Sequence, residues 1–147
     1  MDELQKYVLE QPSKVRAFFA LVETTAGLIG VSEKYWQSHG LNGARIRILV
    51  EIAKAGGSLL PSALAGRIGV TKANISVLLV PLANEGYVRI ADDPEDGRRR
   101  RVTLTPAGER LLLDTLPGNR EVLGDLMSRL SDAEIGQLLE LLGKLGG

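Results

Sequence analysis

Residues 61–80, PSALAGRIGVTKANISVLLV, constrain the fold of this chain more than any other segment. Two short helices with apolar faces are predicted there, joined at a glycine. Ala65 is small enough for a close helix crossing, and Gly69 tolerates the positive φ of a tight turn. Ile75 returns the second helix onto the first, so the spacing fits a helix-turn-helix. The alternative is a plain helical hairpin with a solvated polar face.

The polar side chains of this segment gather at the start and on the outer face of its second helix. In a recognition helix this part meets base edges, where asparagine pairs with adenine, lysine with guanine or phosphate, and serine or threonine with either. The candidate DNA contacts on the two helices are Ser62, Thr71, Lys72, Asn74 and Ser76.

The hydrophobic period then changes from helical to alternating. Residues 87–90 and 101–104 are predicted to be two strands around the turn-rich segment 92–97, DDPEDG. With helices before and after this hairpin, the predicted class is mainly α with a small β-hairpin wing.

Four consecutive arginines begin directly after that acidic turn. A run of charge is usually a solvated face, but at a hairpin tip beside a helix-turn-helix it suits a phosphate backbone and a minor groove. Arg98, Arg99 and Arg100 are therefore expected to contact DNA. Asp96 lies two residues before Arg98 and is expected to support the wing by holding its guanidinium.

The remaining segments have helical periodicity. Asn42, Thr71, Thr105 and Ser131 are predicted N-caps, the last within a capping box. Leu60 is a poor cap, and Pro117-Gly118 should kink the helix that contains it. The predicted helices span residues 12–38, 42–55, 61–68, 71–84, 106–129 and 131–145.

The charge of the chain is unevenly distributed, although 18 basic residues balance 18 acidic ones. Residues 41–106 hold ten basic and six acidic side chains, whereas residues 1–40 hold four and five, and residues 107–147 hold four and seven. A basic centre between acidic ends indicates a polyanion as the partner of the centre alone. The leucine- and aromatic-rich ends, 1–40 and 107–147, are predicted to pack together as a helical dimerisation region, leaving 41–106 as the DNA-binding domain.

These segments together resemble the multiple-antibiotic-resistance regulator (MarR) family of winged-helix repressors over residues 12–145. The most specific stretch, ADDPEDGRRRRVTLTPAGERLL at 91–112, is similar to the family's wing and to the LT-x-x-G entry into its next helix. Residues 41–52 and 68–88 resemble its second helix and its helix-turn-helix. Residues 130–145 resemble its terminal dimer helix.

The resemblance implies a homodimer that binds a pseudo-palindromic operator in double-stranded DNA, with recognition helices in major grooves and wings in minor grooves. It also implies a transcriptional repressor that a small aromatic or phenolic effector releases from its operator. Val77 departs from the family pattern, since a basic or polar residue is frequent there. Pro81 lies inside the recognition helix and should bend or break it.

An effector site can be sought at the end of the first long helix. Tyr35, Trp36 and His39 lie within one turn of each other there, and Arg47 follows in the next helix. An aromatic wall with a titratable donor and an arginine suits a carboxylate or phenolate guest. The alternative is that Trp36 is ordinary core and that His39 only faces the last-turn carbonyls.

Composition excludes several other functions. The chain has no cysteine and one histidine, so thiol chemistry, disulfides and a histidine metal cluster are excluded, and no cofactor is expected. No nucleophile–base pair is recognisable, so an enzyme is not expected. We expect a cytoplasmic protein without a membrane segment. The competing interpretation is a winged-helix protein-interaction module that no longer binds DNA.

Overall fold

The computed structural model describes residues 1–147 as seven helices and three strands. This mainly helical fold with a small antiparallel sheet confirms the predicted class. In chain order the elements are α1 (Asp2–Leu9), α2 (Ser13–Ser38), α3 (Gly43–Lys54), β1 (Ser58–Leu59), α4 (Pro61–Ile68), α5 (Lys72–Asn84), β2 (Val88–Asp92), β3 (Arg100–Leu104), α6 (Pro106–Met127) and α7 (Asp132–Gly146).

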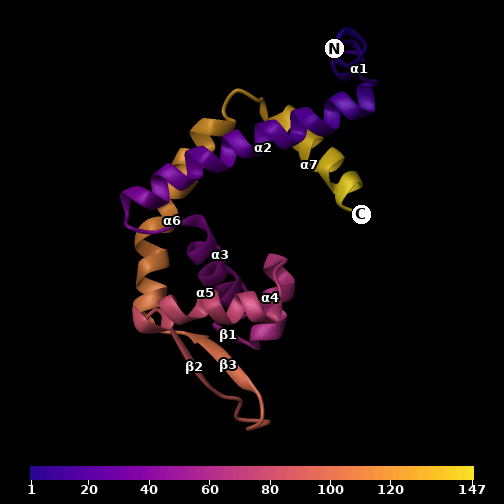
Figure 1. The fold of residues 1–147 in the computed structure, drawn as a ribbon. Helices are drawn as coiled ribbons and strands as arrows, with labels where there is room; N and C mark the ends of the chain where they lie inside the picture. The colour runs from indigo at the N-terminus through magenta and orange to yellow at the C-terminus, as the bar shows by residue number, and fades with distance from the viewer.

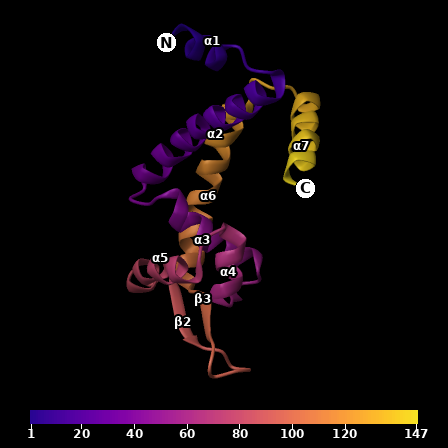
Figure 2. The ribbon, with the colours of Figure 1, turned by 45° about the vertical axis from the view of Figure 1, so that its right-hand side comes forward.

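The molecule is elongated, with a lobe at one end and helices that extend away from it at the other. In Figure 1, α3, α4, α5 and the sheet form the lobe, and α2 and α6 run alongside each other away from it. Both termini, with α1 and α7, lie at the far end, and Figure 2 shows α7 standing apart from the α2–α6 pair. The two chain ends therefore lie at the same end of the molecule, remote from the lobe.

The hydrophobic core lies within the lobe and extends only to its junction with the long helices. Trp36 from α2 and Leu112 from α6 join it from outside the lobe. The side chains that are fully buried belong to the lobe and are Ile48, Leu49, Ile52, Leu64, Ile75, Leu79, Leu82 and Val102. By contrast, α1 and α7 bury none of their residues. The lobe is thus a folded unit, whereas the helical ends are unpartnered.

The sheet has one more strand than the sequence predicted. β1 pairs antiparallel with β3, placing Leu59 opposite Val102, and β3 pairs with β2 on its other edge. A strand of two residues is too short to show a period, and only its partner in space defines it. This third strand ties the base of the wing to the end of α3.

Local signals set the helix starts. The four predicted cap residues each accept a backbone hydrogen bond, with Asn42 Oδ1 bonded to Arg45 N at 2.9 Å and Ser131 Oγ to Glu134 N at 3.2 Å. Leu60 provides no side-chain cap, as expected. The capping pattern in the sequence therefore placed these N-termini correctly.

The two internal prolines do not interrupt their helices. α5 continues through Pro81 to Asn84, so the predicted break there does not occur. Leu79 and Leu82 are buried on either side of Pro81 and hold both parts of the helix against the core. α6 likewise runs through Pro117 without ending, and its ribbon changes direction along its length in Figure 1.

Candidate nucleic-acid interface

The turn between α4 and α5 has the geometry that the sequence indicated. Gly69 has φ 75°, and its N–H and that of Val70 both donate to the Ala65 carbonyl at 3.0 Å. Ala65 and Ile75 are buried where the two helices cross. The helix axes meet at 104°, within the range of helix-turn-helix motifs.

The candidate contacts on α4 and α5 are all exposed, but they differ in what they can still bind. Thr71 Oγ1 accepts the Asn74 N–H at 3.1 Å, so its oxygen serves as the helix cap. The Ser76 hydroxyl donates to the Lys72 carbonyl at 3.3 Å. Ser62 lies in the first turn of α4. The Asn74 amide and the Lys72 ammonium are consequently the groups on α5 most available to a ligand.

The wing presents its arginines on the tip between β2 and β3. Arg98 is 94% exposed, and its Nε lies 3.5 Å from Asp96 Oδ1, which also accepts the Arg98 backbone N–H at 3.1 Å. The Arg99 Nε lies 3.5 Å from the second oxygen of Asp96. Arg100 is exposed at the start of β3. Asp96 therefore supports two arginines, where the sequence indicated one.

A second carboxylate that sequence reasoning did not single out organises this tip. Asp93 is 7% exposed, accepts the Glu95 N–H at 3.1 Å, and lies 3.7 Å from the Arg99 guanidinium. Its own N–H donates to the Arg99 carbonyl at 2.8 Å. The sequence alone does not show which of the four acidic residues in the turn is buried. The tip is thus closed by Asp93, which leaves Arg98 projecting.

The lobe presents α5 and the wing at one end of the molecule. In both ribbon views α5 and the β2–β3 hairpin lie at the end remote from the termini. An ion pair between Arg45 and Glu85 at 2.9 Å links the start of α3 to the end of α5. The C-terminal end of α5 is therefore linked to α3, and its N-terminal end follows the Gly69 turn from α4.

The residues considered for an effector site lie at the joint between α2, α3 and α6. Trp36 is 3% exposed and stacks edge-on against Tyr35, with ring centroids 4.9 Å apart. The Tyr35 hydroxyl donates to the Thr115 carbonyl at 2.5 Å, and His39 lies exposed beside the Tyr35 ring. Arg47 instead donates to the Arg67 carbonyl at the end of α4. The structure thus groups Tyr35, Trp36 and His39, while Arg47 is engaged elsewhere.

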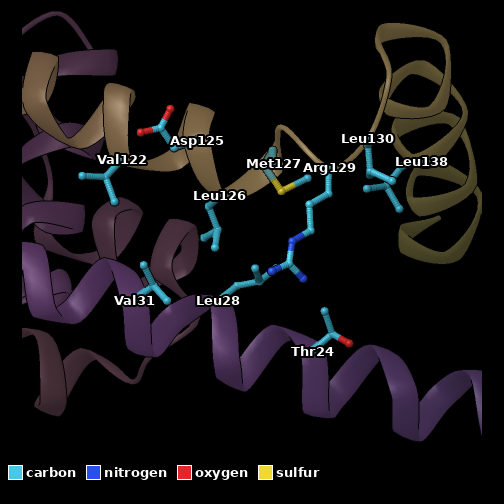
Figure 3. Close-up of a pocket in the computed structure, with 10 residues that line it drawn as sticks. All are labelled: Thr24, Leu28, Val31, Val122, Asp125, Leu126, Met127, Arg129, Leu130 and Leu138. Atoms are coloured by element: carbon cyan, nitrogen blue, oxygen red, sulfur yellow. The ribbon is translucent and has the colours of Figure 1, made fainter.

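A separate hollow lies between the helical ends, with a volume of about 680 Å³. Figure 3 shows Thr24, Leu28 and Val31 of α2 facing Leu126 of α6 across it, with the Arg129 side chain extending toward α2. Its lining is predominantly apolar and comes from α2, α6, the segment between α6 and α7, and Leu138 of α7. By length and composition alone α2 is also long and apolar enough to cross a membrane, and none of its apolar window is buried within the single chain. No group of residues in this structure has metal-binding geometry.

Comparison with known proteins agrees with this geometry. The chain is 30% identical to the HTH-type transcriptional repressor YetL of Bacillus subtilis, over 98% of its own length and 87% of that protein. The MarR family profile matches residues 39–99, from the end of α2 to the wing.

Solved structures show the same fold at lower identity. The structure of Sco3205 from Streptomyces coelicolor in complex with DNA superposes with a TM-score of 0.84 at 22% identity, covering 93% of this chain and 88% of that one. CouR from Rhodococcus jostii RHA1, bound to p-coumaroyl-CoA, gives 0.79 at 21% identity, over 92% and 95%. The match of this chain to YetL over nearly its full length, together with the match to the family profile, places the chain in the MarR family of transcriptional regulators.

Proposed function

We propose that this protein is a cytoplasmic homodimeric repressor that binds a pseudo-palindromic operator in double-stranded DNA. The observation that carries the proposal is the joint presentation of α5 and the wing at one end of the molecule. Asn74 and Lys72 would contact base edges, and Arg98 would enter the flanking minor groove. Thr71, Ser62 and Ser76 would add contacts to the backbone, with Arg99 and Arg100 near the phosphates.

The surface area of the single chain supports a dimer. The chain exposes 10557 Å², whereas a compact protein of 15.8 kDa exposes about 7,300 Å². The excess of about 3,200 Å² per chain, or about 6,400 Å² for two chains, lies at the upper end of the total area that obligate interfaces bury. It lies largely on the helical ends, where Phe18, Phe19 and Ile29 of α2 and Leu139 and Leu142 of α7 are exposed. A second copy would cover these apolar faces and leave both lobes free for DNA.

Effector release would act through the joint between α2 and α6. A phenolic or aromatic guest beside His39 would compete with the Tyr35 hydroxyl for the Thr115 carbonyl, changing how α2 is held against α6. Because each lobe follows these helices, their angle sets the separation of the two recognition helices. The bound p-coumaroyl-CoA of CouR, a protein with this fold, supports an aromatic effector class.

DNA binding is tested by gel shift and fluorescence anisotropy on the duplex that the protein selects from a random-sequence pool. Affinity should fall steeply between about 50 and 200 mM salt, because phosphate contacts release counterions. Arg98→Ala should reduce both affinity and the salt slope on every duplex, whereas Asn74→Ala should relax preference at particular base pairs by about 1–3 kcal/mol. Failure to recover any preferred duplex, with no salt dependence, would refute the proposal and favour a protein-interaction module.

Effector release is tested separately by titrating simple phenols and aromatic carboxylates into the preformed complex. The emission of Trp36, the sole tryptophan, should change in the same concentration range in which DNA is released. Tyr35→Phe should shift that range, because the competing hydroxyl is gone. If no compound changes either signal, the effector part is wrong while DNA binding stands.

A further inference from the structure

An exposed apolar side chain on the recognition helix is not explained by packing. Val77 is 70% exposed near the middle of α5, whereas Ile75, Leu79 and Leu82 of the same helix are buried in the core. The side chain therefore contributes little to the fold and faces whatever α5 binds. A valine offers neither a hydrogen bond nor a charge, so any specific contact that it makes must be apolar.

The position of Val77 relative to Asn74 defines where that contact would fall. The two residues are three apart, so they share the outer face of α5, with Val77 about 4.5 Å further along the axis. Successive base pairs are stacked about 3.4 Å apart. If Asn74 reads an adenine, Val77 faces a neighbouring base pair in the same groove.

The electrostatics of the helix favour a nucleic acid over an apolar protein as the occupant of this face. Lys72 begins α5, and the helix contains no acidic residue between Lys72 and Asn84. The wing adds the exposed side chains of Arg98 and Arg100, with Asp96 beside Arg98. The only apolar group that base pairs present in the major groove is the thymine 5-methyl, and apolar side chains are its usual partners.

We propose that Val77 is a specificity-determining residue that packs against the 5-methyl group of a thymine beside the base contacted by Asn74. This inference rests on the proposed function, because it needs α5 in the major groove. It names a base preference that a basic or polar residue at the same position would not give.

The test replaces thymine by deoxyuridine, which removes the methyl group and keeps every hydrogen bond. The probe is the duplex selected from a random pool, with each symmetric pair of thymines replaced in turn. At one pair, wild-type affinity should fall about fourfold per half-site, the value of one buried methyl-sized group. Val77→Ala should bind the unmodified duplex more weakly by about the same factor and lose sensitivity to that replacement.

Val80→Ala is the matched control, because Val80 is also exposed on α5, at 53%, but lies further from its N-terminus. This variant should stay sensitive to deoxyuridine, and circular dichroism should show that both variants keep their helix content. Equal wild-type affinity for all thymine and deoxyuridine duplexes would overturn the inference and leave DNA binding intact, as would a Val77→Ala protein that still discriminates them. A protein that selects no duplex would refute the proposed function itself, and this inference with it.

Discussion

Asp93 shows how a single buried carboxylate shapes the wing tip, which we propose contacts DNA. It accepts a backbone hydrogen bond from Glu95 and pairs with Arg99, while its own N–H bonds to the Arg99 carbonyl. These contacts cross-link the two sides of the wing tip, and Arg98 is left at its outer edge. The acid thus acts by positioning cations, although its own charge opposes phosphate.

We expect Asp93→Asn to weaken operator binding, because Arg99 loses its partner and the tip loses its order. Asp92→Asn is the matched control: it removes the same charge from the neighbouring residue, which is exposed and forms no ion pair. Anisotropy at fixed salt should show Asp92→Asn equal to or tighter than wild type and Asp93→Asn several-fold weaker. If both variants bind more tightly, phosphate repulsion outweighs positioning.

Tyr35 and Gly118 form a close contact that fixes α2 against α6. A Cβ at Gly118 would overlap the Tyr35 hydroxyl, which itself donates to the Thr115 carbonyl. Glycine at this position is therefore required by the approach of a side chain from another helix. The Tyr35 side chain, which was considered as part of an effector site, thus also holds α2 against α6.

Gly118→Ala should destabilise the fold by about 1–3 kcal/mol through overpacking, and Tyr35→Phe by about 1 kcal/mol through the lost hydrogen bond. The double variant should be less destabilised than the sum, since removing the hydroxyl relieves the overlap. Chemical denaturation of the four proteins measures this coupling. Strict additivity would show that the two residues do not press on each other.

The start of α7 illustrates a helix N-terminus that is capped by residues of its own sequence. The Ser131 N–H donates to the Glu134 carboxylate at 2.9 Å, and Ser131 Oγ accepts the Glu134 N–H. Hydrogen bonding to the Glu134 carboxylate, first from the Ser131 backbone N–H and then from the Ser131 side chain, holds the pKa of Glu134 below its ordinary value. Because the folded state favours the ionised form, this capping contribution is present above the unfolded-state pKa and is lost as pH falls through the folded-state pKa.

Ser131→Ala should raise the pKa of Glu134 toward its ordinary value, because the helix N-terminus loses its cap and the return hydrogen bond loosens. A carboxyl-carbon NMR titration of Glu134 measures this directly. Ser128→Ala is the control, since its hydroxyl bonds only to the Asp125 carbonyl and should leave the titration unchanged. An unshifted titration in Ser131→Ala would contradict the capping-box assignment.

The whole molecule leaves many apolar side chains exposed, as the dimer that we propose would require. Only 18 of 147 residues are buried, and no residue of α1 or α7 is among them. An amphipathic helix without a partner is not stable on propensity alone in water. In the proposed dimer, the acidic, apolar ends would provide association and the basic lobe would bind DNA.

We expect the protein to be a dimer by light scattering, with twice the 15.8 kDa mass of one chain. Val22→Glu with Ile29→Glu, one heptad apart on exposed α2, should yield monomers, because like charges replace the apolar stripe. DNA affinity should then drop by about a hundredfold or more, since the second half-site is no longer engaged intramolecularly. Ala63→Glu is the control, because it adds a charge at an exposed position of α4 in the lobe, and this variant should remain a dimer. A wild-type protein that is a monomer in light scattering would contradict the proposed assembly.

Much of this protein follows from local sequence. Helix starts at Asn42, Thr71, Thr105 and Ser131, the glycine turn at Gly69 and the hairpin depend on residues a few positions apart, and each is where the pattern predicted it. The continuation of α5 through Pro81 was mispredicted, because buried leucines on both sides outweigh the missing backbone donor.

Other features depend on residues that are distant in sequence. β1 exists through its pairing with β3, and Tyr35 meets Thr115 across 80 positions. The burial of Asp93 and the exposure of Val77 likewise follow from which neighbours the fold places around them. Hydrophobic spacing and capping depend on residues a few positions apart, so they can be predicted from the sequence. Which polar groups remain free to bind, and which apolar faces remain uncovered, is decided only when distant segments pack and the competing contacts are satisfied.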